Sequence, residues 1–215
     1  MAGPVKRTRR YDSSRRRAQA AATRTEILGA ARRQFERRGY AATTMEAIAT
    51  DAGVALKTVY VGFETKSRLL RALWNHLLRA GRDETPVAEQ QWYRDMVRQP
   101  DPERQLRLLA RNVRVNKLRI AGVLEVIRSA APADAEIGAL WQLIQSDFHA
   151  NQRVIAQSLG EKDALRPGLD VEAATDILWA LNLSNVWHGL VVERGWTPER
   201  FEQWLGDVLI AQLLR

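Results

Sequence analysis

Three polar side chains with hydrogen-bond donors lie close together in the first third of the chain. Lys57, Thr58 and Tyr60 carry an ammonium group and two hydroxyl groups, and no carboxylate interrupts them. Such donors suit phosphate oxygens and the acceptor edges of bases. Val59 and Phe63 are spaced to lie together on the opposite face of a short helix. The segment therefore predicts a helix with one buried side and one side suited to nucleic acid.

The residues just before this helix predict the elements that position it. Residues 43–52 place apolar side chains at helical spacing, and Thr43 with Glu46 has the form of a capping box. Gly53 follows, and glycine tolerates the left-handed backbone of a sharp helix exit. Two short helices around such a turn form a helix-turn-helix, whose second helix enters the major groove of DNA. A helical hairpin is also common in all-α proteins that bind no DNA, so the surrounding charge matters.

Positive charge is concentrated toward the N-terminus of this 215-residue chain, whose formal net charge is +8. Residues 1–24 carry eight Lys/Arg and one Asp, residues 25–80 nine basic and five acidic residues, and residues 81–215 sixteen basic and nineteen acidic residues. A basic head on a mildly acidic body indicates nucleic-acid binding by the head. Residues 1–17 have little apolar content and predict a disordered basic arm. The arm either reaches DNA, with Arg15, Arg16 and Arg17 among its contacts, or is a solvated tail.

The spacing of the whole region resembles the tetracycline-repressor-like (TetR) family of transcriptional regulators. The resemblance covers about residues 23–75 and is carried by the runs Phe35-x-x-x-Gly39-Tyr40-x-x-Thr43-Thr44 and Gly53-Val54-x-x-x-Thr58-Val59-Tyr60-x-x-Phe63-x-x-Lys66-x-x-Leu69-Leu70. Two positions depart from the family. Ala55 stands where a capping serine is usual, which typically costs about 1 kcal/mol of helix stability. Gly62 stands where His or Tyr usually touches phosphate, so that contact is not expected here.

The resemblance implies a homodimeric, ligand-responsive DNA-binding regulator, a repressor that binds a palindromic operator. We expect Thr44, Thr58, Tyr60 and Lys66 to bind phosphates, and Leu56, Lys57 and Val61 to face base edges. Lys57 is the expected guanine reader.

The rest of the chain predicts helices and no strands, so the expected fold is all-α. A first helix is expected from about Ala18 to Arg38 and a fourth from Lys66 to Arg79. The loop at residues 81–87 divides a helix-turn-helix domain, residues 18–80, from a helical ligand-binding and dimerisation domain, residues 81–215. In that body we expect helices at about 88–98, 101–116, 119–131, 133–159 and 171–193, and a last helix from Thr197 onward.

Two sets of body residues are expected to have functions. Polar and aromatic side chains on otherwise apolar helices are expected to line a cavity for a small-molecule effector: Asn112, Asn116, Trp141, Gln145, Phe148, His149, Gln152, Trp179 and Asn182. For any one of these, plain packing or solvent exposure is an equal alternative. The last two helices carry more apolar surface than one core needs, and in the resembled family they form the dimer interface. The expected interface residues are Trp187, Leu190, Phe201, Trp204, Leu205, Val208 and Leu209.

The sequence offers little for catalysis or metal binding. It contains no cysteine, and its three histidines, His76, His149 and His188, have no ligand-like spacing. We therefore expect no enzyme activity, no cofactor and no metal. The longest apolar segment, 177–192, is interrupted by polar residues, and no signal peptide is visible, so a cytoplasmic protein without membrane contact is expected. The alternatives are a ligand-independent DNA-binding regulator and a helical protein-interaction module.

Overall fold

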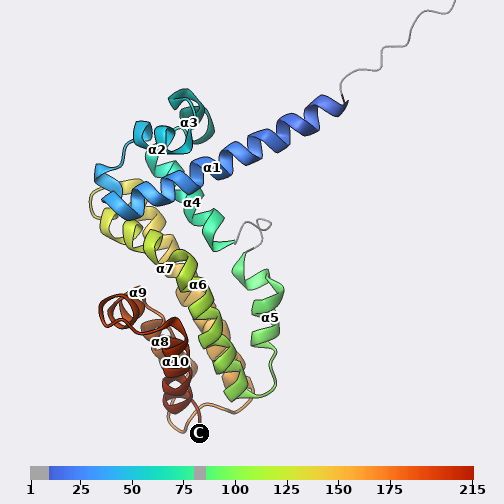
Figure 1. Ribbon diagram of the computed structural model, residues 1–215. Coiled ribbons are helices and arrows are strands. Elements are labelled where there is room, and N and C mark those ends of the chain that lie inside the picture. Colours follow the sequence, from blue (N-terminus) through green and yellow to red (C-terminus); the bar gives the residue numbers. More distant parts are fainter. Residues whose placement is uncertain (1–9, 80–85) are drawn as a thin grey trace, which may run out of the picture. The chain divides into compact units, whose positions relative to one another are not determined.

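The computed structural model describes residues 10–79 and 86–215, with side chains described from Ser14 onward. These residues fold into helices without a β-strand, which confirms the predicted all-α class (Figure 1). None of the described helices is both long and apolar enough to cross a membrane. The chain divides into two compact units, Met1–Leu73 and Trp74–Arg215. The division falls inside the fourth helix, before the predicted boundary at residues 80 and 81.

The first unit contains α1 (Arg10–Ala42), α2 (Met45–Ala52), α3 (Leu56–Phe63) and the start of α4 (Lys66–Leu78). The predicted buried stripe of α1 is confirmed, because Ile27, Leu28, Ala31 and Phe35 are at most 3% exposed. The apolar side chains of α2, α3 and α4 complete this core with Met45, Ile48, Val59, Phe63, Leu69 and Leu70. Burial of this stripe is what holds α2 and α3 against α1, since helices this short are marginal by themselves.

Helix α1 begins earlier than predicted. We expected a disordered arm through Arg17, whereas α1 already includes residues 10–17, and residues 1–9 lie outside the described part of the chain. Arginine has a good helix propensity, so a basic composition does not prevent a helix from extending. The helical run is interrupted at Gly39, whose φ of 75° is left-handed, where we expected a terminating glycine.

Helix α2 ends at the expected glycine, but it begins with a different N-cap from the predicted one. Gly53 has φ 66°, and its N–H donates to the oxygens that end α2. The predicted capping box on Thr43 is wrong: Thr44 is the N-cap, and its hydroxyl oxygen accepts from Ala47 N at 3.1 Å. The Thr43 hydroxyl is buried instead and lies 2.7 Å from Gly39 O. Two adjacent threonines have the same short-range signal, so the sequence does not distinguish them.

The second unit consists of the end of α4 and the body helices that follow it. Their bounds are η1 (Val87–Glu89), α5 (Gln91–Val97), α6 (Pro102–Ala130), α7 (Ala135–Glu161), α8 (Val171–Leu181), α9 (Ser184–Trp187), the π-helical η2 (His188–Glu193) and α10 (Pro198–Leu213). The two helices predicted at 101–116 and 119–131 are one continuous helix, because no glycine or proline lies between Asn116 and Arg119. The single helix predicted at 171–193 is interrupted after Leu181 and passes through α9 and η2.

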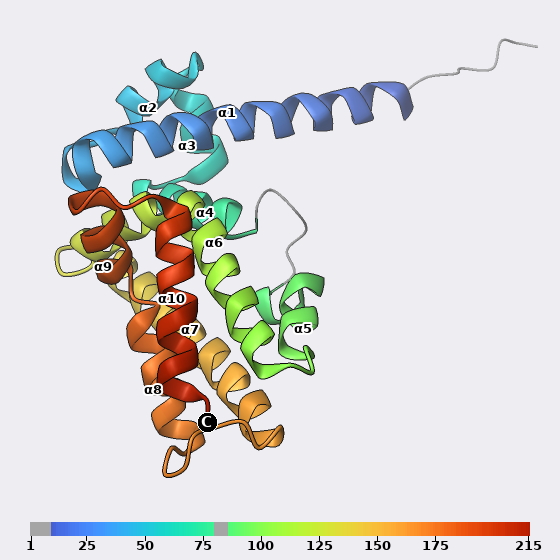
Figure 2. The same cartoon turned by 60° about the horizontal axis from the view of Figure 1, so that its bottom comes forward.

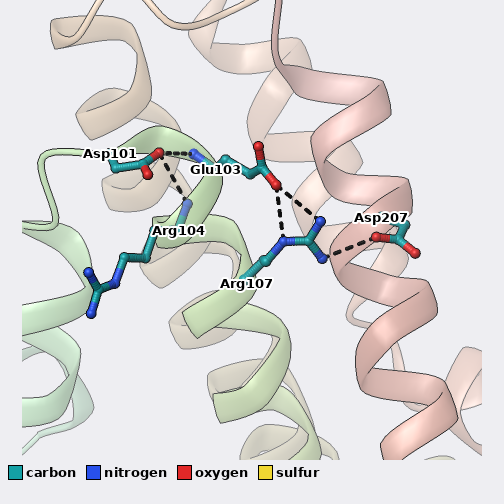
Figure 3. A network of polar contacts seen from close by, with 5 residues as sticks. All are labelled: Asp101, Glu103, Arg104, Arg107 and Asp207. Carbon is teal, nitrogen blue, oxygen red and sulfur yellow. Dashed lines mark hydrogen bonds and ion pairs between the residues drawn. The ribbon is translucent and has the colours of Figure 1, made fainter.

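The long body helices pack in pairs, α6 against α10 and α7 against α8 (Figure 2). Arg107 of α6 joins the first pair at the surface, since its guanidinium contacts Glu103 at 3.0 Å and Asp207 of α10 at 3.1 Å (Figure 3). Asp101 caps the start of α6 by accepting from Glu103 N and Arg104 N. The ion pairs of Arg107 are exposed and contribute little, so apolar burial supplies most of the stability of this helix pair.

Candidate nucleic-acid interface and internal cavity

Helix α3 is amphipathic in the predicted sense. Val59 is fully buried and Phe63 is 4% exposed, while Lys57 and Thr58 are exposed. Tyr60 and Val61 are 44% and 77% exposed, and Leu56 is partly buried at the first position of the helix. An exposed valine beside donors is unusual for a purely solvated face and suits contact with base edges. Ala55 provides no side-chain cap, so α3 is held by its buried residues.

Arg24 of α1 supports the end of α3, a feature that sequence reasoning missed. Its Nη1 donates to Gly62 O at 3.4 Å, and its guanidinium carbon lies 4.5 Å from the centroid of the Phe63 ring. A cation at a helix C-terminus is favourable because backbone oxygens there carry partial negative charge. Arg24 therefore brings an exposed positive charge to the position where Gly62 has no side chain.

The structure gives Lys66 a role inside the first unit. Its Nζ donates to Tyr40 O at 2.8 Å and to Thr43 O at 3.0 Å, and it lies 4.3 Å from the centroid of the Tyr40 ring. These contacts use the ammonium donors that we expected to bind phosphate. Thr44 is exposed and accepts from Ala47 N, which leaves its own hydroxyl hydrogen available. Arg15, Arg16 and Arg17 are exposed on the first turns of α1.

The second unit contains a small cavity of about 70 Å³ between helices of the body. The stripes that line it follow helical spacing: positions 109, 112, 113, 116, 117 and 120 on α6, and positions 148, 151, 152 and 155 on α7. Five predicted ligand residues lie in its wall, namely Asn112, Asn116, Phe148, Gln152 and Asn182. The aromatic residues Trp92 and Tyr93 of α5 complete it. The wall is mostly apolar with a few polar groups, as in small-molecule sites.

Four predicted ligand residues lie elsewhere. Trp141 and Gln145 line a separate hollow with Phe148. His149 and Trp179 pack edge-to-face with ring centroids 6.4 Å apart, and His149 Nε2 lies 3.5 Å from Asp176 Oδ1. The sequence position of a residue on a helix does not show whether it lines the cavity or lies elsewhere, because α7 presents polar residues to more than one neighbour.

Sequence reasoning also missed Lys117, the charged residue in the cavity wall. It is 3% exposed, and its Nζ donates to Asn182 O at 2.8 Å and Ser184 Oγ at 3.2 Å. Burial lowers the pKa of the Lys117 ammonium to about 7. The sequence did contain a signal for its burial, because Lys117 lies four residues after Val113 and three before Ile120, and both of these are buried. This spacing places Lys117 on the buried face of the helix.

The predicted dimer surface is largely internal to this chain. Trp187, Phe201, Leu205 and Leu209 are at most 4% exposed, within the same hydrophobic core as Leu106 and Leu178. Leu190, Trp204 and Val208 are only partly buried. The first four are therefore corrected to core residues, and only the last three are available to a partner.

Comparison with known proteins agrees with this geometry. The model of the family described as bacterial regulatory proteins, tetR family, matches residues 27–73, which contain the helix-turn-helix. The HTH-type transcriptional regulator TtgR of Pseudomonas putida is 36% identical over 111 residues, covering 48% of this chain and 52% of TtgR. The probable regulator ArpR, also of P. putida, is 35% identical over a segment of the same length. The chain thus spans about half the length of the curated relatives it matches.

Solved structures resemble nearly the whole chain. The structure of NalD, the secondary repressor of the MexAB-OprM multidrug efflux pump in Pseudomonas aeruginosa, is 26% identical with a TM-score of 0.67, covering 91% of this chain and 98% of NalD. The complex of Stenotrophomonas maltophilia SmeT with triclosan has the same fold, with 24% identity, a TM-score of 0.69, and coverage of 90% and 92%. Residues 27–73 thus match the tetR family of bacterial regulatory proteins, and nearly the whole chain shares its fold with NalD.

Proposed function

We propose that this protein is a ligand-responsive transcriptional repressor that binds a palindromic operator as a homodimer in the cytoplasm. The observation that carries this proposal is the exposed face of α3, where Lys57, Thr58, Tyr60 and Val61 stand opposite the buried Val59. The match of residues 27–73 to the tetR family supports it, and NalD, whose fold this chain shares, is a repressor. No catalytic role is proposed.

In this proposal residues 1–17 act as a basic arm, residues 18–80 as the DNA-binding head, and residues 81–215 as the ligand-binding and dimerisation body. Thr44, Thr58 and Tyr60 bind phosphates, while Leu56, Lys57 and Val61 face bases. Lys66 is removed from the phosphate set, since its ammonium holds backbone oxygens within the head. Arg24, which lies beside Gly62, is added to the proposed phosphate-binding residues.

The cavity favours a ligand-responsive regulator over a ligand-independent one. Its volume of about 70 Å³ is below the roughly 300–1,000 Å³ of drug-sized ligand sites, so it must expand to hold such a molecule. A ligand that binds the expanded form shifts the population toward that form. Repression is relieved if the expanded form has the lower affinity for DNA.

Selection of random double-stranded DNA by the purified protein tests the function. We expect the recovered sequences to share a palindrome with half-sites about one helical turn apart or a multiple of it. Recovery of sequences without a common motif, at the same yield as with a protein lacking residues 43–63, would exclude a sequence-specific regulator. Scattering or sedimentation of the complex then gives the number of subunits bound.

A further inference from the structure

The cavity of the second unit contains a buried cation without a counter-ion. No carboxylate of the described part of the chain forms an ion pair with Lys117, and its ammonium contacts only Asn182 O, Ser184 Oγ and, at 5.9 Å, the face of the Phe148 ring. A lysine has three N–H donors, and these contacts supply two oxygen acceptors. Removing an ammonium from water is costly unless it is paired and hydrogen-bonded. The site is therefore unusually receptive to an anion.

The partial compensation that Lys117 does receive comes from backbone. Asn182 is the C-cap of α8, so its oxygen belongs to the negative end of that helix. A helix terminus carries only about half an elementary charge, which leaves part of the lysine charge uncompensated. The ammonium also joins the end of α8 to Ser184, the first residue of α9. A ligand that binds Lys117 thus acts directly on the junction between these two helices.

A second group in the same wall lacks a partner. Gln152 is 5% exposed, and its Oε1 has no hydrogen-bond partner in the structure. It lies one turn after Phe148 on α7, so the two side chains share a face of the helix. The other titratable side chain in the wall is Tyr93, whose hydroxyl donates to Asn151 O at 2.7 Å and whose pKa is raised by burial. The wall therefore contains a buried cation, a buried acceptor without a partner and no carboxylate side chain.

We propose that the effector of this protein is a small monocarboxylate with an apolar body, whose carboxylate binds Lys117. The apolar part packs against Trp92, Phe148 and Ile155, and the carboxylate takes the N–H of Lys117 that has no acceptor. This inference rests on the proposed function in one respect, that the cavity is the effector site. The charge preference itself is a property of the cavity and holds whether or not DNA is bound.

Isothermal titration calorimetry of the full chain without DNA tests this with two matched pairs, benzoate with benzamide and octanoate with octanamide. Each amide has the shape of its acid and no charge. Hydrogen bonds to charged groups are worth about 1.5–3 kcal/mol, which corresponds to roughly 10- to 100-fold tighter binding of the carboxylate. Lys117→Met should reduce this ratio to about one. Lys162→Met is the matched control, because Lys162 is also partly buried in the body but lies outside the cavity wall.

Proton linkage gives a readout that a merely structural lysine would not move. At pH 8 carboxylate binding should take up protons in the wild type, because the anion restores the charged form of Lys117, and amide binding should not. Tyr93 is the other titratable side chain in the wall, and burial raises its pKa away from this pH. Arg119 lies outside the wall and donates to the wall residue Asn116, and an arginine stays charged throughout. Equal affinity for acid and amide, or no binding of either acid by the wild type, overturns the proposal.

Acid binding and DNA selection together distinguish a wrong effector class from a wrong proposed function. If selected DNA is bound specifically but both acids are bound no better than their amides, the regulator stands and the effector class is wrong. If the acids bind as expected and no DNA sequence is preferred, the carboxylate site stands and the regulator is wrong.

Discussion

The ammonium group of Lys66 lies 2.8 Å from the backbone oxygen of Tyr40 and 4.3 Å from the centroid of the Tyr40 ring. The contact joins the first residue of α4 to the end of α1, across 26 residues of sequence. It places the lysine ammonium beside backbone oxygens at the end of α1, where a positive charge is favourable. Lys66 thereby fixes the end of α1 against the start of α4, on either side of the helix-turn-helix.

Replacing Lys66 by Met should destabilise the protein. Hydrogen bonds to a charged group contribute about 1.5–3 kcal/mol, and the freed oxygens of Tyr40 and Thr43 lose their donor. Thermal unfolding measures this, with the exposed Lys57→Met as control, for which an unchanged melting temperature is expected. An unchanged melting temperature for Lys66→Met, with a salt slope of DNA binding smaller by about 0.9, would instead make Lys66 a phosphate contact.

Lys57→Ala should weaken operator binding by about 1–3 kcal/mol and relax the preference at one base pair of each half-site. The effect follows from the loss of a donor pair to a guanine edge, while the fold is unaffected because Lys57 is exposed. Binding to a set of operators with single base changes measures it. The same loss on operator and random DNA would assign Lys57 to the phosphate backbone.

Deletion of residues 1–17 should weaken binding to all DNA and make the salt dependence shallower. It removes Lys6, Arg7, Arg9, Arg10, Arg15, Arg16 and Arg17, and the slope should fall by roughly 0.9 for each phosphate that these cations neutralise in the full chain. Deletion of residues 1–9, which removes three of these cations, should have a smaller effect. If both deletions leave the slope of the full chain unchanged, the N-terminal cations do not touch DNA.

Lys117→Met should alter how stability depends on pH. The pKa of Lys117 is about 7 in the folded protein and 10.5 for an ordinary lysine, so between these values the unfolded chain binds more protons. Wild-type stability due to this group therefore rises with pH through this window, and below pH 7 the full cost of burying the charge remains. The advantage of Lys117→Met over the wild type should be largest near pH 6 and should shrink toward pH 10.

Melting temperatures of the two proteins across this range give the result, since 1 kcal/mol corresponds to about 2–4 °C in a chain of this size. The Lys162→Met variant provides the control for a partly buried lysine outside the cavity. A constant difference between Lys117→Met and wild type from pH 6 to pH 10 would show that Lys117 stays charged in the folded state.

Two substitutions on α10 should separate folding from assembly. Leu205 is 1% exposed, so Leu205→Ala should cost about 2–5 kcal/mol of stability. Val208 is partly exposed, so Val208→Glu should leave the subunit folded and convert dimers to monomers. Sedimentation velocity distinguishes them, with the exposed Gln157→Glu as a charge-matched control. A wild-type monomer at micromolar concentration would contradict the homodimer.

Local patterns predict the first unit well because its signals are short-range. The stripe of α1, the glycine turn and the buried Val59 and Phe63 each depend on spacing within a few turns. The cap was predicted at the wrong threonine and the start of α1 too far along the chain, because several neighbouring residues could satisfy each feature equally. Helix ends of this kind are the least determined part of a pattern.

The body is harder to predict because the sequence does not show which neighbour covers an apolar stripe. The apolar spacing of Phe201 and Leu205 predicts a partner surface, whereas α6 and the other body helices already bury them. Lys117 escapes prediction for the opposite reason: a lysine is usually a surface residue, and only packing reveals that its stem and ammonium are enclosed.

In the proposed function, the head recognises a DNA sequence and the body releases that DNA when a ligand binds. Fluorescence anisotropy with the selected palindrome and a scrambled duplex of equal length, at one physiological salt concentration, tests it most directly. We predict at least about 1,000-fold tighter binding of the palindrome, and loss of that complex on addition of octanoate but not octanamide. Equal affinity for the two duplexes would contradict sequence-specific recognition by the head, and a palindrome complex that octanoate leaves intact at saturating concentration would contradict release by a carboxylate.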